Sequence, residues 1–479
     1  MSKNTSNTQQ AFWVALGGLF SFGFGIVSSV ILSRYFAKAD YGTYKQVLYI
    51  YSTMLVIFTL GLPKAYSFFL PRTENHQAKD VITKITNLFF ILGAFFSIVL
   101  FLLSGQIATL LKNEDLDLAI KIFSPVPFFL LPTMGVEGIL ATYRMTQFTA
   151  VYTVITRVAM LSAVVLPVLL FDVGYIGALI GFTVSSFFIF LIAFYLKYLP
   201  LKKFGKEKSS LKYIEIFKYS LPLMVASLWG VIETSSDQFF ISRYYGAEVF
   251  ADYSNGAMEL PFIGMILGAT AAVLSPVFSK MAYQKVDIKK DLYPLWIRVF
   301  EKSSMLTYPL LIFAMCFASE LMVLLYGKAY AGSAIYFQIF NFYFFFKIIV
   351  YGPYLINTGR QQLYANAHMY SVLILIPVQF LVVYLTNNPI TLIVASVVVK
   401  IGRTFFFLNV ISKDFGIKFR EILPILPLFK IMLPALFLIY SIKYLISVSF
   451  ELSNFWTLFL GGVLYFSLYT LYSYIFKID

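Results

Sequence analysis

The chain has 479 residues, of which 59% are hydrophobic and 13% are charged, and its formal net charge is +14 at pH 7. A water-soluble protein needs many more polar residues on its surface, so this composition excludes that class and indicates a protein that crosses a membrane many times. The positive charge is therefore interpreted through the positions of the basic residues relative to the membrane, and nucleic acid is not an expected partner.

Taken in chain order, the apolar stretches predict about fourteen transmembrane helices. Each stretch of about 20 residues can cross a hydrocarbon core of roughly 30 Å as a helix. Barrel strands are excluded because the stretches are too long and do not alternate between apolar and polar residues. The predicted spans are 11–33, 41–62, 84–104, 118–140, 150–171, 174–196, 216–241, 249–272, 300–325, 333–356, 365–386, 389–410, 424–447 and 454–476.

Basic residues gather in alternate connections between these spans. They fall mainly within 64–84, 197–218, 280–302 and 403–430. Because Lys and Arg favour the cytoplasmic side of a membrane, this bias predicts that both chain termini are cytoplasmic. The opposite, outer connections hold few basic residues, mainly Arg34, Lys38, Lys112, Lys121, Arg243 and Lys328.

A degenerate repeat links the two halves of the chain. Residues 31–44 resemble residues 240–253, and the alignment pairs Arg34 with Arg243 at an offset of 243 − 34 = 209 residues. Six predicted helices precede the helix of the second copy. Since six is even, both copies end on the same outer face, which predicts parallel repeats related by an axis along the membrane normal. A weaker similarity between residues 103–111 and 318–325 supports the duplication.

The repeat predicts how the chain is organised. The expected parts are a first six-helix lobe (1–198), a cytoplasmic linker (199–212), a second six-helix lobe (213–412) and two appended helices (413–479). The appended helices have no counterpart in the duplication.

Three helix exits carry a resemblance to a known family. They read SRYFAKADYGTY at 33–44, LSPVFSK at 274–280 and VLLYGKAY at 323–330. With fourteen helices in a 6+6+2 layout, they resemble the polysaccharide-flippase (Wzx-like) branch of the multidrug/oligosaccharidyl-lipid/polysaccharide exporter (MOP) superfamily. The resemblance implies two lobes in a V, as in MATE transporters, and alternating access in the bacterial cytoplasmic membrane. It also implies cargo moved to the outer leaflet: an undecaprenyl-diphosphate-linked oligosaccharide for O-antigen or another surface polymer, with polymerase or assembly proteins as partners.

The first predicted helix carries a small residue at every fourth position. These residues are Gly17, Ser21, Gly25, Ser29 and Ser33. Such a stripe is typical of close helix packing, and it is also what a helix facing a cargo cleft would present. The sequence leaves both interpretations open.

Charged residues inside predicted spans are the candidate site residues, because an ionisable group in hydrocarbon costs several kcal/mol unless it is paired or faces water. Six lie deep within spans of the second half: Glu233, Asp237, Glu259, Lys347, Lys400 and Arg403. Glu233 and Asp237 share a helix face because they are four residues apart. Ion pairs of Glu233 or Asp237 with Lys347 or Lys400 would be a purely structural use of these charges.

The functional hypothesis divides these charges by sign. Lys347, Lys400 and Arg403, with Arg34 and Arg243 at the outer rim, would bind the diphosphate or the glycan. The carboxylates of Glu233, Asp237 and Glu259 would bind the coupling ion, H⁺ or Na⁺.

In the first half, Arg34, Lys45, Glu137, Arg144 and Arg157 come near a span. For Lys45, Arg144 and Arg157 the expectation is that the side chain reaches the lipid headgroups from a helix end.

No phosphate-cradling glycine loop, His/Cys metal spacing or nucleophile motif is found, so neither a cofactor nor enzymatic catalysis is expected. The main alternative is a MATE-type antiporter of drug or metabolite cations, which usually has twelve helices. A membrane glycosyltransferase or polymerase is the third possibility, but it would require a larger outer loop.

Overall fold

The computed structural model describes residues 7–205, 207–284, 290, 292–347, 351–423 and 425–476. Within these ranges all regular elements are helices. Among the described residues, eleven helices are long and apolar enough to cross a membrane, or thirteen if each of two bent pairs forms one span. The prediction of an all-α polytopic membrane protein is confirmed, and the predicted count of about fourteen is approximate.

The chain divides into two compact units, residues 1–251 and 252–479. The lobe and linker boundaries predicted from the sequence stay a prediction. The helices that begin in the first unit are α1 (Asn7–Tyr35), α2 (Lys38–Thr59), α3 (Pro63–Phe69), α4 (Ala78–Leu111), α5 (Asp115–Phe123), α6 (Val126–Leu130), α7 (Val136–Thr142), α8 (Thr146–Phe171), α9 (Gly174–Tyr198) and α10 (Tyr213–Gly256).

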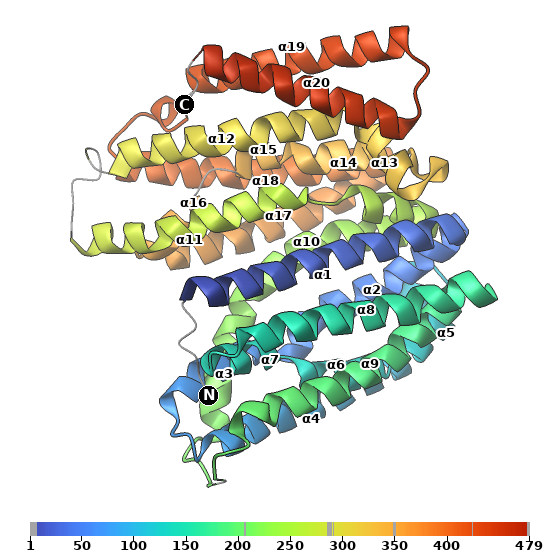
Figure 1. The fold of residues 1–479 in the computed structure, drawn as a ribbon, viewed down its shortest axis with the longest axis vertical. Coiled ribbons are helices and arrows are strands. Elements are labelled where there is room, and N and C mark those ends of the chain that lie inside the picture. Colours follow the sequence, from blue (N-terminus) through green and yellow to red (C-terminus); the bar gives the residue numbers. More distant parts are fainter. Residues whose placement is uncertain are drawn as a thin grey trace. The chain divides into compact units, whose positions relative to one another are not determined.

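The second unit contains the remaining helices. They are α11 (Pro261–Tyr283), α12 (Tyr293–Cys316), α13 (Ala318–Tyr326), α14 (Ser333–Phe342), α15 (Phe344–Lys347), α16 (Tyr351–Asn357), α17 (Gln361–Thr386), α18 (Pro389–Asp414), α19 (Ile425–Ser449) and α20 (Asn454–Ile475). Within this unit α19 and α20 lie side by side, and α19 packs along α12 (Figure 1).

In the first unit, α8 packs between α1 and α9 (Figure 1). The approach of α9 to α8 is close enough to require glycine, because a Cβ atom on Gly181 would lie 1.9 Å from the Ala163 carbonyl oxygen. Small residues thus let the backbones of apolar helices approach, as they do in membrane proteins generally.

The predicted span 118–140 is matched by one apolar segment long enough to cross a membrane, Asp115–Thr142, but this segment is not a continuous helix. It consists of α5, α6, a 3₁₀ turn (Leu131–Thr133) and α7. Three prolines, Pro125, Pro127 and Pro132, lie at these breaks, where a missing N–H and a bulky ring interrupt the helical hydrogen bonds.

A break is present between the predicted spans 216–241 and 249–272, but it is a single residue and not the predicted loop. Helical structure continues from Tyr213 to Gly256 except at Gly246, whose φ of 82° and ψ of 178° turn the chain within one residue. Because this region of backbone space is open almost only to glycine, one residue replaces a loop. The helix then ends at Gly256, and Pro261 begins α11.

The predicted span 300–325 is bent by 72° between α12 and α13. Lys443 on α19 compensates the backbone at this bend, since its Nζ donates to the Cys316 carbonyl oxygen at 2.6 Å and lies 2.9 Å from Glu320 Oε1. Phe317 is buried at the bend, and a Cβ atom on Gly461 of α20 would lie 2.8 Å from its ring. The two appended helices therefore pack against the bend itself.

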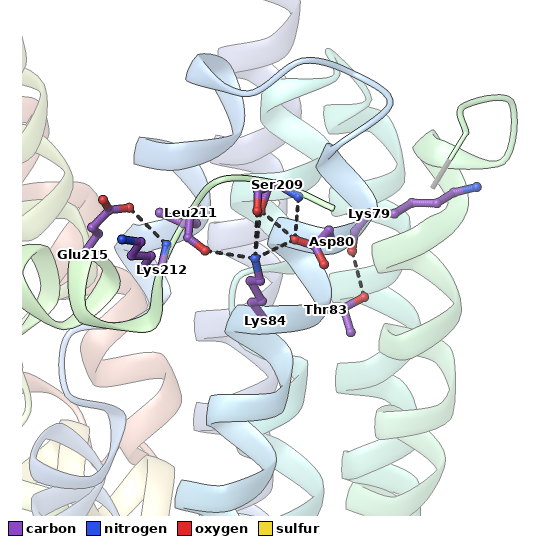
Figure 2. Close-up of polar contacts among 8 residues, drawn as sticks. All are labelled: Lys79, Asp80, Thr83, Lys84, Ser209, Leu211, Lys212 and Glu215. Carbon is purple, nitrogen blue, oxygen red and sulfur yellow. Dashed lines mark hydrogen bonds and ion pairs between the residues drawn. The ribbon is translucent and has the colours of Figure 1, made fainter. Parts of the chain in front are cut away.

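The segment between α9 and α10 is held on the start of α4. Figure 2 shows Asp80 accepting hydrogen bonds from the Ser209 backbone N–H at 2.9 Å and from its hydroxyl at 2.6 Å. Lys84 Nζ pairs with Asp80 at 2.8 Å and donates to the Leu211 carbonyl at 2.9 Å. Lys79 donates to the Phe204 carbonyl at 2.6 Å. We call this end of the first unit the linker end.

The sequence repeat has a counterpart in side-chain contacts. In the first unit, Asn113 Nδ2 donates to Thr43 Oγ1 at 2.9 Å, just after the end of α4. In the second unit, Ser333 Oγ donates to Asp252 Oδ1 at 3.1 Å. Thr43 and Asp252 are separated by the repeat offset, 252 − 43 = 209 residues. Each half thus ties its second helix to the N-terminal end of its fourth helix.

Candidate functional site

The first unit contains two adjoining cavities of about 480 Å³ and 220 Å³. Both are lined by Arg157, Met160 and Phe182, so they meet at the middle of α8. Along α1 their lining runs from Trp13 to Ser29, which is about 24 Å at 1.5 Å per residue. We call the two together the lobe cavity.

The charged groups of the lobe cavity are Lys45, Glu137 and Arg157. Arg157 and Glu137 are exposed although both belong to helical segments of the bundle. Exposed ionisable groups at such positions face water or a ligand rather than hydrocarbon. Two basic groups and one acidic group give the lobe cavity a formal excess of one positive charge.

Arg157 lies near the middle of its helix. The observed α8 begins at Thr146, four residues before the predicted span, so Arg157 is the twelfth of 26 residues. At 1.5 Å per residue it is more than about 16 Å from either end of α8, which is beyond the reach of an arginine side chain. The expectation that Arg157 extends to the headgroups stays a prediction, which this depth within α8 weighs against.

Lys45 also points into the unit. Its Nζ donates to Ser29 Oγ on α1 at 2.9 Å, and it lies 5.4 Å from the ring centre of Tyr41. It lines the smaller part of the lobe cavity with Gly25 and Ser28. Lys45 is thus held by a hydroxyl of the small-residue stripe.

The stripe itself serves both purposes that the sequence left open. A Cβ atom on Gly17 would contact the Ala150 backbone of α8 at 3.7 Å, as in close helix packing. A Cβ atom on Gly25 would meet nothing within 4 Å. Gly17, Ser21, Gly25 and Ser29 all line the lobe cavity.

Two predicted cations and the predicted acidic pair also lie in the first unit. Arg34 is exposed at the end of α1. Arg243, on α10, donates through Nη1 to the Leu110 carbonyl oxygen at the end of α4. Neither arginine lines the lobe cavity.

Glu233 and Asp237 are buried on α10. Ser235, between them, contacts α2 through Tyr49 and Thr53. Because residues two apart point about 200° apart on a helix, the acidic pair lies on the face of α10 turned away from α2.

In the second unit, the structure brings Glu259 and Lys347 together, with Oε2 and Nζ 3.9 Å apart. Arg403 Nη1 lies 3.0 Å from His368 Nδ1, and its Nη2 donates to Tyr343 Oη at 3.4 Å. Lys400 is buried on the same helix as Arg403. The roles predicted for these residues stay predictions, as does pairing of Glu233 or Asp237 with Lys347 or Lys400.

Sequence reasoning missed the role of Lys45, Glu137 and Arg157 as cavity residues. A signal was present in the spacing: Lys45 is sixteen residues after Ser29, across a tight connection, so the two can face each other on neighbouring helices. The missing information was the true start of α8, which determines how deep Arg157 lies.

Comparison with known proteins gives matches over most of the chain. The sequence profile of a family described as "Polysaccharide biosynthesis protein" matches residues 8–282, which is more than half of the chain. The uncharacterized membrane protein MJ1068 of Methanocaldococcus jannaschii is 23% identical over 362 residues, or 71% of each chain.

Solved structures match the fold. The lipid II flippase MurJ in an inward closed conformation has a TM-score of 0.74 and 16% identity, covering 96% of this chain and 98% of that one. A multidrug resistance MATE family transporter of the MOP superfamily, in an inward-facing conformation, has a TM-score of 0.65 and 13% identity, covering 82% of this chain and 94% of that one. This likeness shows the fold.

Proposed function

Because the chain belongs to the polysaccharide biosynthesis protein family, we propose that it carries an undecaprenyl-diphosphate-linked oligosaccharide across the bacterial cytoplasmic membrane. The cargo would move from the inner to the outer leaflet by alternating access, with both chain termini in the cytoplasm. The proposal describes transport without chemical conversion of the cargo.

The observation that carries the proposal is Arg157 in the middle of α8. An arginine at mid-span costs about 3 kcal/mol unless it serves a purpose there, and its planar fork of donors fits phosphate oxygens. Lys45 adds a second cation farther along the lobe cavity, toward the end opposite the linker. A diphosphate group could therefore meet positive charge at two depths of the first unit.

The same charges weigh against a MATE-type antiporter of amphipathic cations. Lys45 and Arg157 would repel a cationic cargo, and Glu137 is the only carboxylate among the residues that line the described cavity. We therefore rank the cation antiporter below the flippase.

For the driving force, we retain Glu233, Asp237 and Glu259 as the proposed binding groups of H⁺ or Na⁺. Glu259 lies 3.9 Å from Lys347, so a cation bound at Glu259 would compete with the ammonium group. Glu233 and Asp237, buried on one face of α10, are the better pair for an ion site. Lys347, Lys400, Arg403, Arg34 and Arg243 remain proposed contacts for the diphosphate or the glycan.

The test is a flipping assay with the purified full-length protein in liposomes. The substrate is a fluorescent undecaprenyl-diphosphate glycan, whose inner-leaflet fraction is measured by protection from a membrane-impermeant quencher. We expect the Lys45→Gln/Arg157→Gln double variant to flip at least about tenfold more slowly, which corresponds to the loss of one charge-assisted contact. Arg144→Gln is the control, because Arg144 does not line the lobe cavity. Wild-type flipping by the double variant would contradict the proposal.

A further inference from the structure

A second hollow of about 970 Å³ lies at the end of α4 opposite the linker. Its lining comes from the last turns of α4, from Asp117 and Lys121 of α5, and from Arg243 of α10. It shares no lining residue with the lobe cavity. Counted along α4 from Lys84 to Gly105, the hollow is about 32 Å from the linker contacts. We call it the distal hollow.

The distal hollow carries more positive than negative charge. Its single carboxylate, Asp117, accepts from Ser104 Oγ at 2.6 Å and from Lys121 Nζ at 2.8 Å. Lys121 thus uses one of three donors on this carboxylate, and Arg243 uses one of five on the Leu110 carbonyl. The other donors of two cations lie beside the same hollow, a suitable arrangement for a tetrahedral anion.

The surroundings of the distal hollow are those of a membrane interface. Tyr244, next to Arg243, has the Arg243 guanidinium 5.6 Å and the Lys112 ammonium 5.9 Å from its ring centre. Tyrosine with flanking cations is typical of the headgroup level of a bilayer. Three of the few basic residues predicted for the outer side, Lys112, Lys121 and Arg243, are therefore gathered at one end of α4.

An apolar stripe leads away from the distal hollow along α4. It consists of Ile91, Phe95, Ile98 and Leu102, each more than half exposed. Their spacing of three or four residues keeps them on one helix face, and the stripe is about 17 Å long at 1.5 Å per residue. Leu102 belongs to both the stripe and the lining of the hollow.

We propose that the distal hollow binds the phosphate of an anionic phospholipid, with an acyl chain along the stripe of α4. The cations at one end and the apolar stripe below them match the two parts of such a lipid, and a soluble anion would not need the stripe. Under the topology predicted from the basic residues, this lipid belongs to the outer leaflet. The proposal assigns Arg243 to this lipid in place of the cargo contact retained for it above, and it does not otherwise depend on the proposed function.

The test measures thermal unfolding of the purified full-length protein in detergent, with added dioleoyl phosphatidylglycerol or dioleoyl phosphatidylcholine. A ligand that binds only the folded protein raises the unfolding temperature in a concentration-dependent way. We expect phosphatidylglycerol to stabilise the wild type and phosphatidylcholine not to. The Lys121→Gln/Arg243→Gln double variant should need about tenfold more phosphatidylglycerol for the same shift.

The matched control is Arg34→Gln, because Arg34 is the repeat counterpart of Arg243 but does not line the distal hollow. It should keep the wild-type response. Arg243 also contacts the end of α4, so each variant is first compared without lipid, and Lys121→Gln alone tests the site if the double variant is unstable. We expect this single variant to need about threefold more lipid.

Three kinds of result would overturn the proposal. The first is a missing difference: an equal shift in unfolding temperature with both phospholipids, or an unchanged phosphatidylglycerol response in Lys121→Gln and in the folded double variant. The second is the same shift from sodium pyrophosphate, which would assign the hollow to a soluble anion. The third is a shift from farnesyl diphosphate at a tenth of the phosphatidylglycerol concentration, which would assign it to a prenyl-diphosphate cargo.

Discussion

The third helix of each half, α4 in the first and α12 in the second, holds a segment at its start. In both halves this segment follows the sixth helix. The chemistry of the contact differs between the two halves. At α4, Asp80 and Lys84 hold Ser209 and Leu211 through an ion pair and hydrogen bonds (Figure 2). At α12, Trp296 Nε1 donates to the Ile422 carbonyl at 3.3 Å, and its ring lies 5.7 Å from that of Phe415. Duplication has thus kept the place of the contact but not its residues.

The same two helices differ along their length. α4 continues for 34 residues, whereas the helix that matches it in the sequence is bent by 72° between α12 and α13. The second unit alone has the appended helices α19 and α20, and they supply Lys443 and Gly461 at the bend. The shape of a repeated helix therefore depends on what packs against it as well as on its own residues.

The largest expected effect is at the aromatic contact of the second half. Trp296 is 3% exposed, so Trp296→Ala should cost about 4 kcal/mol of unfolding free energy through the cavity it leaves. Thermal unfolding in detergent measures the loss. Trp456→Ala, at an exposed tryptophan of α20, should change stability by less than about 0.5 kcal/mol. Equal effects of the two variants would contradict this account.

The bend at Phe317 is tested next. Lys443→Met removes the ammonium group that contacts Glu320 and the Cys316 carbonyl. The free energy of unfolding should fall by about 2 kcal/mol, which is less than for a fully buried pair because this pair is partly exposed. Lys430→Met on the same helix is the control, because Lys430 is exposed. Adding Glu320→Gln to Lys443→Met should restore part of the stability. If it restores none, the charge of Glu320 is not the cause.

The turn between the first two helices of each half gives a smaller effect. Gly246→Ala should lower the free energy of unfolding by about 1.5 kcal/mol, because φ is 82° at this residue and residues with a Cβ atom rarely adopt this backbone conformation. Its repeat counterpart, Ala37 (246 − 209 = 37), has φ of −55°. Ala37→Gly should therefore cost less than about 1 kcal/mol. Thermal unfolding compares the two, and the opposite ranking would exclude backbone strain as the cause.

The smallest expected effect is at the ionic contact of the first half. Asp80→Asn should weaken the linker contact by about 1 kcal/mol, which makes tryptic cleavage at Lys202, Lys203 and Lys208 about fivefold faster. Added salt should reduce the difference from the wild type. Asp172→Asn, at the exposed end of α8, is the control. Salt should not affect the Trp296 contact.

Much of the fold was predictable, because the length of the apolar stretches strongly constrains the number and position of the membrane-crossing helices. The predictions that failed depended on single residues with local or tertiary causes. Gly246 turns the chain without a loop, and the bend at Phe317 depends on α19 and α20, more than 100 residues away in sequence. Of the candidate site, the sequence identified the small-residue stripe but not the depth of Arg157, which follows from where α8 begins.

The linker contacts also bear on the order in which the protein is made. The described residues of 204–211 are held by groups that precede them in the chain, His76, Lys79, Asp80 and Lys84. A ribosome therefore releases every partner of this contact before the second unit exists, and domains generally fold in the order of synthesis. The contact at Trp296 must wait for residues 415–422. The first half can thus be closed at its linker end while most of the second half is still being translated.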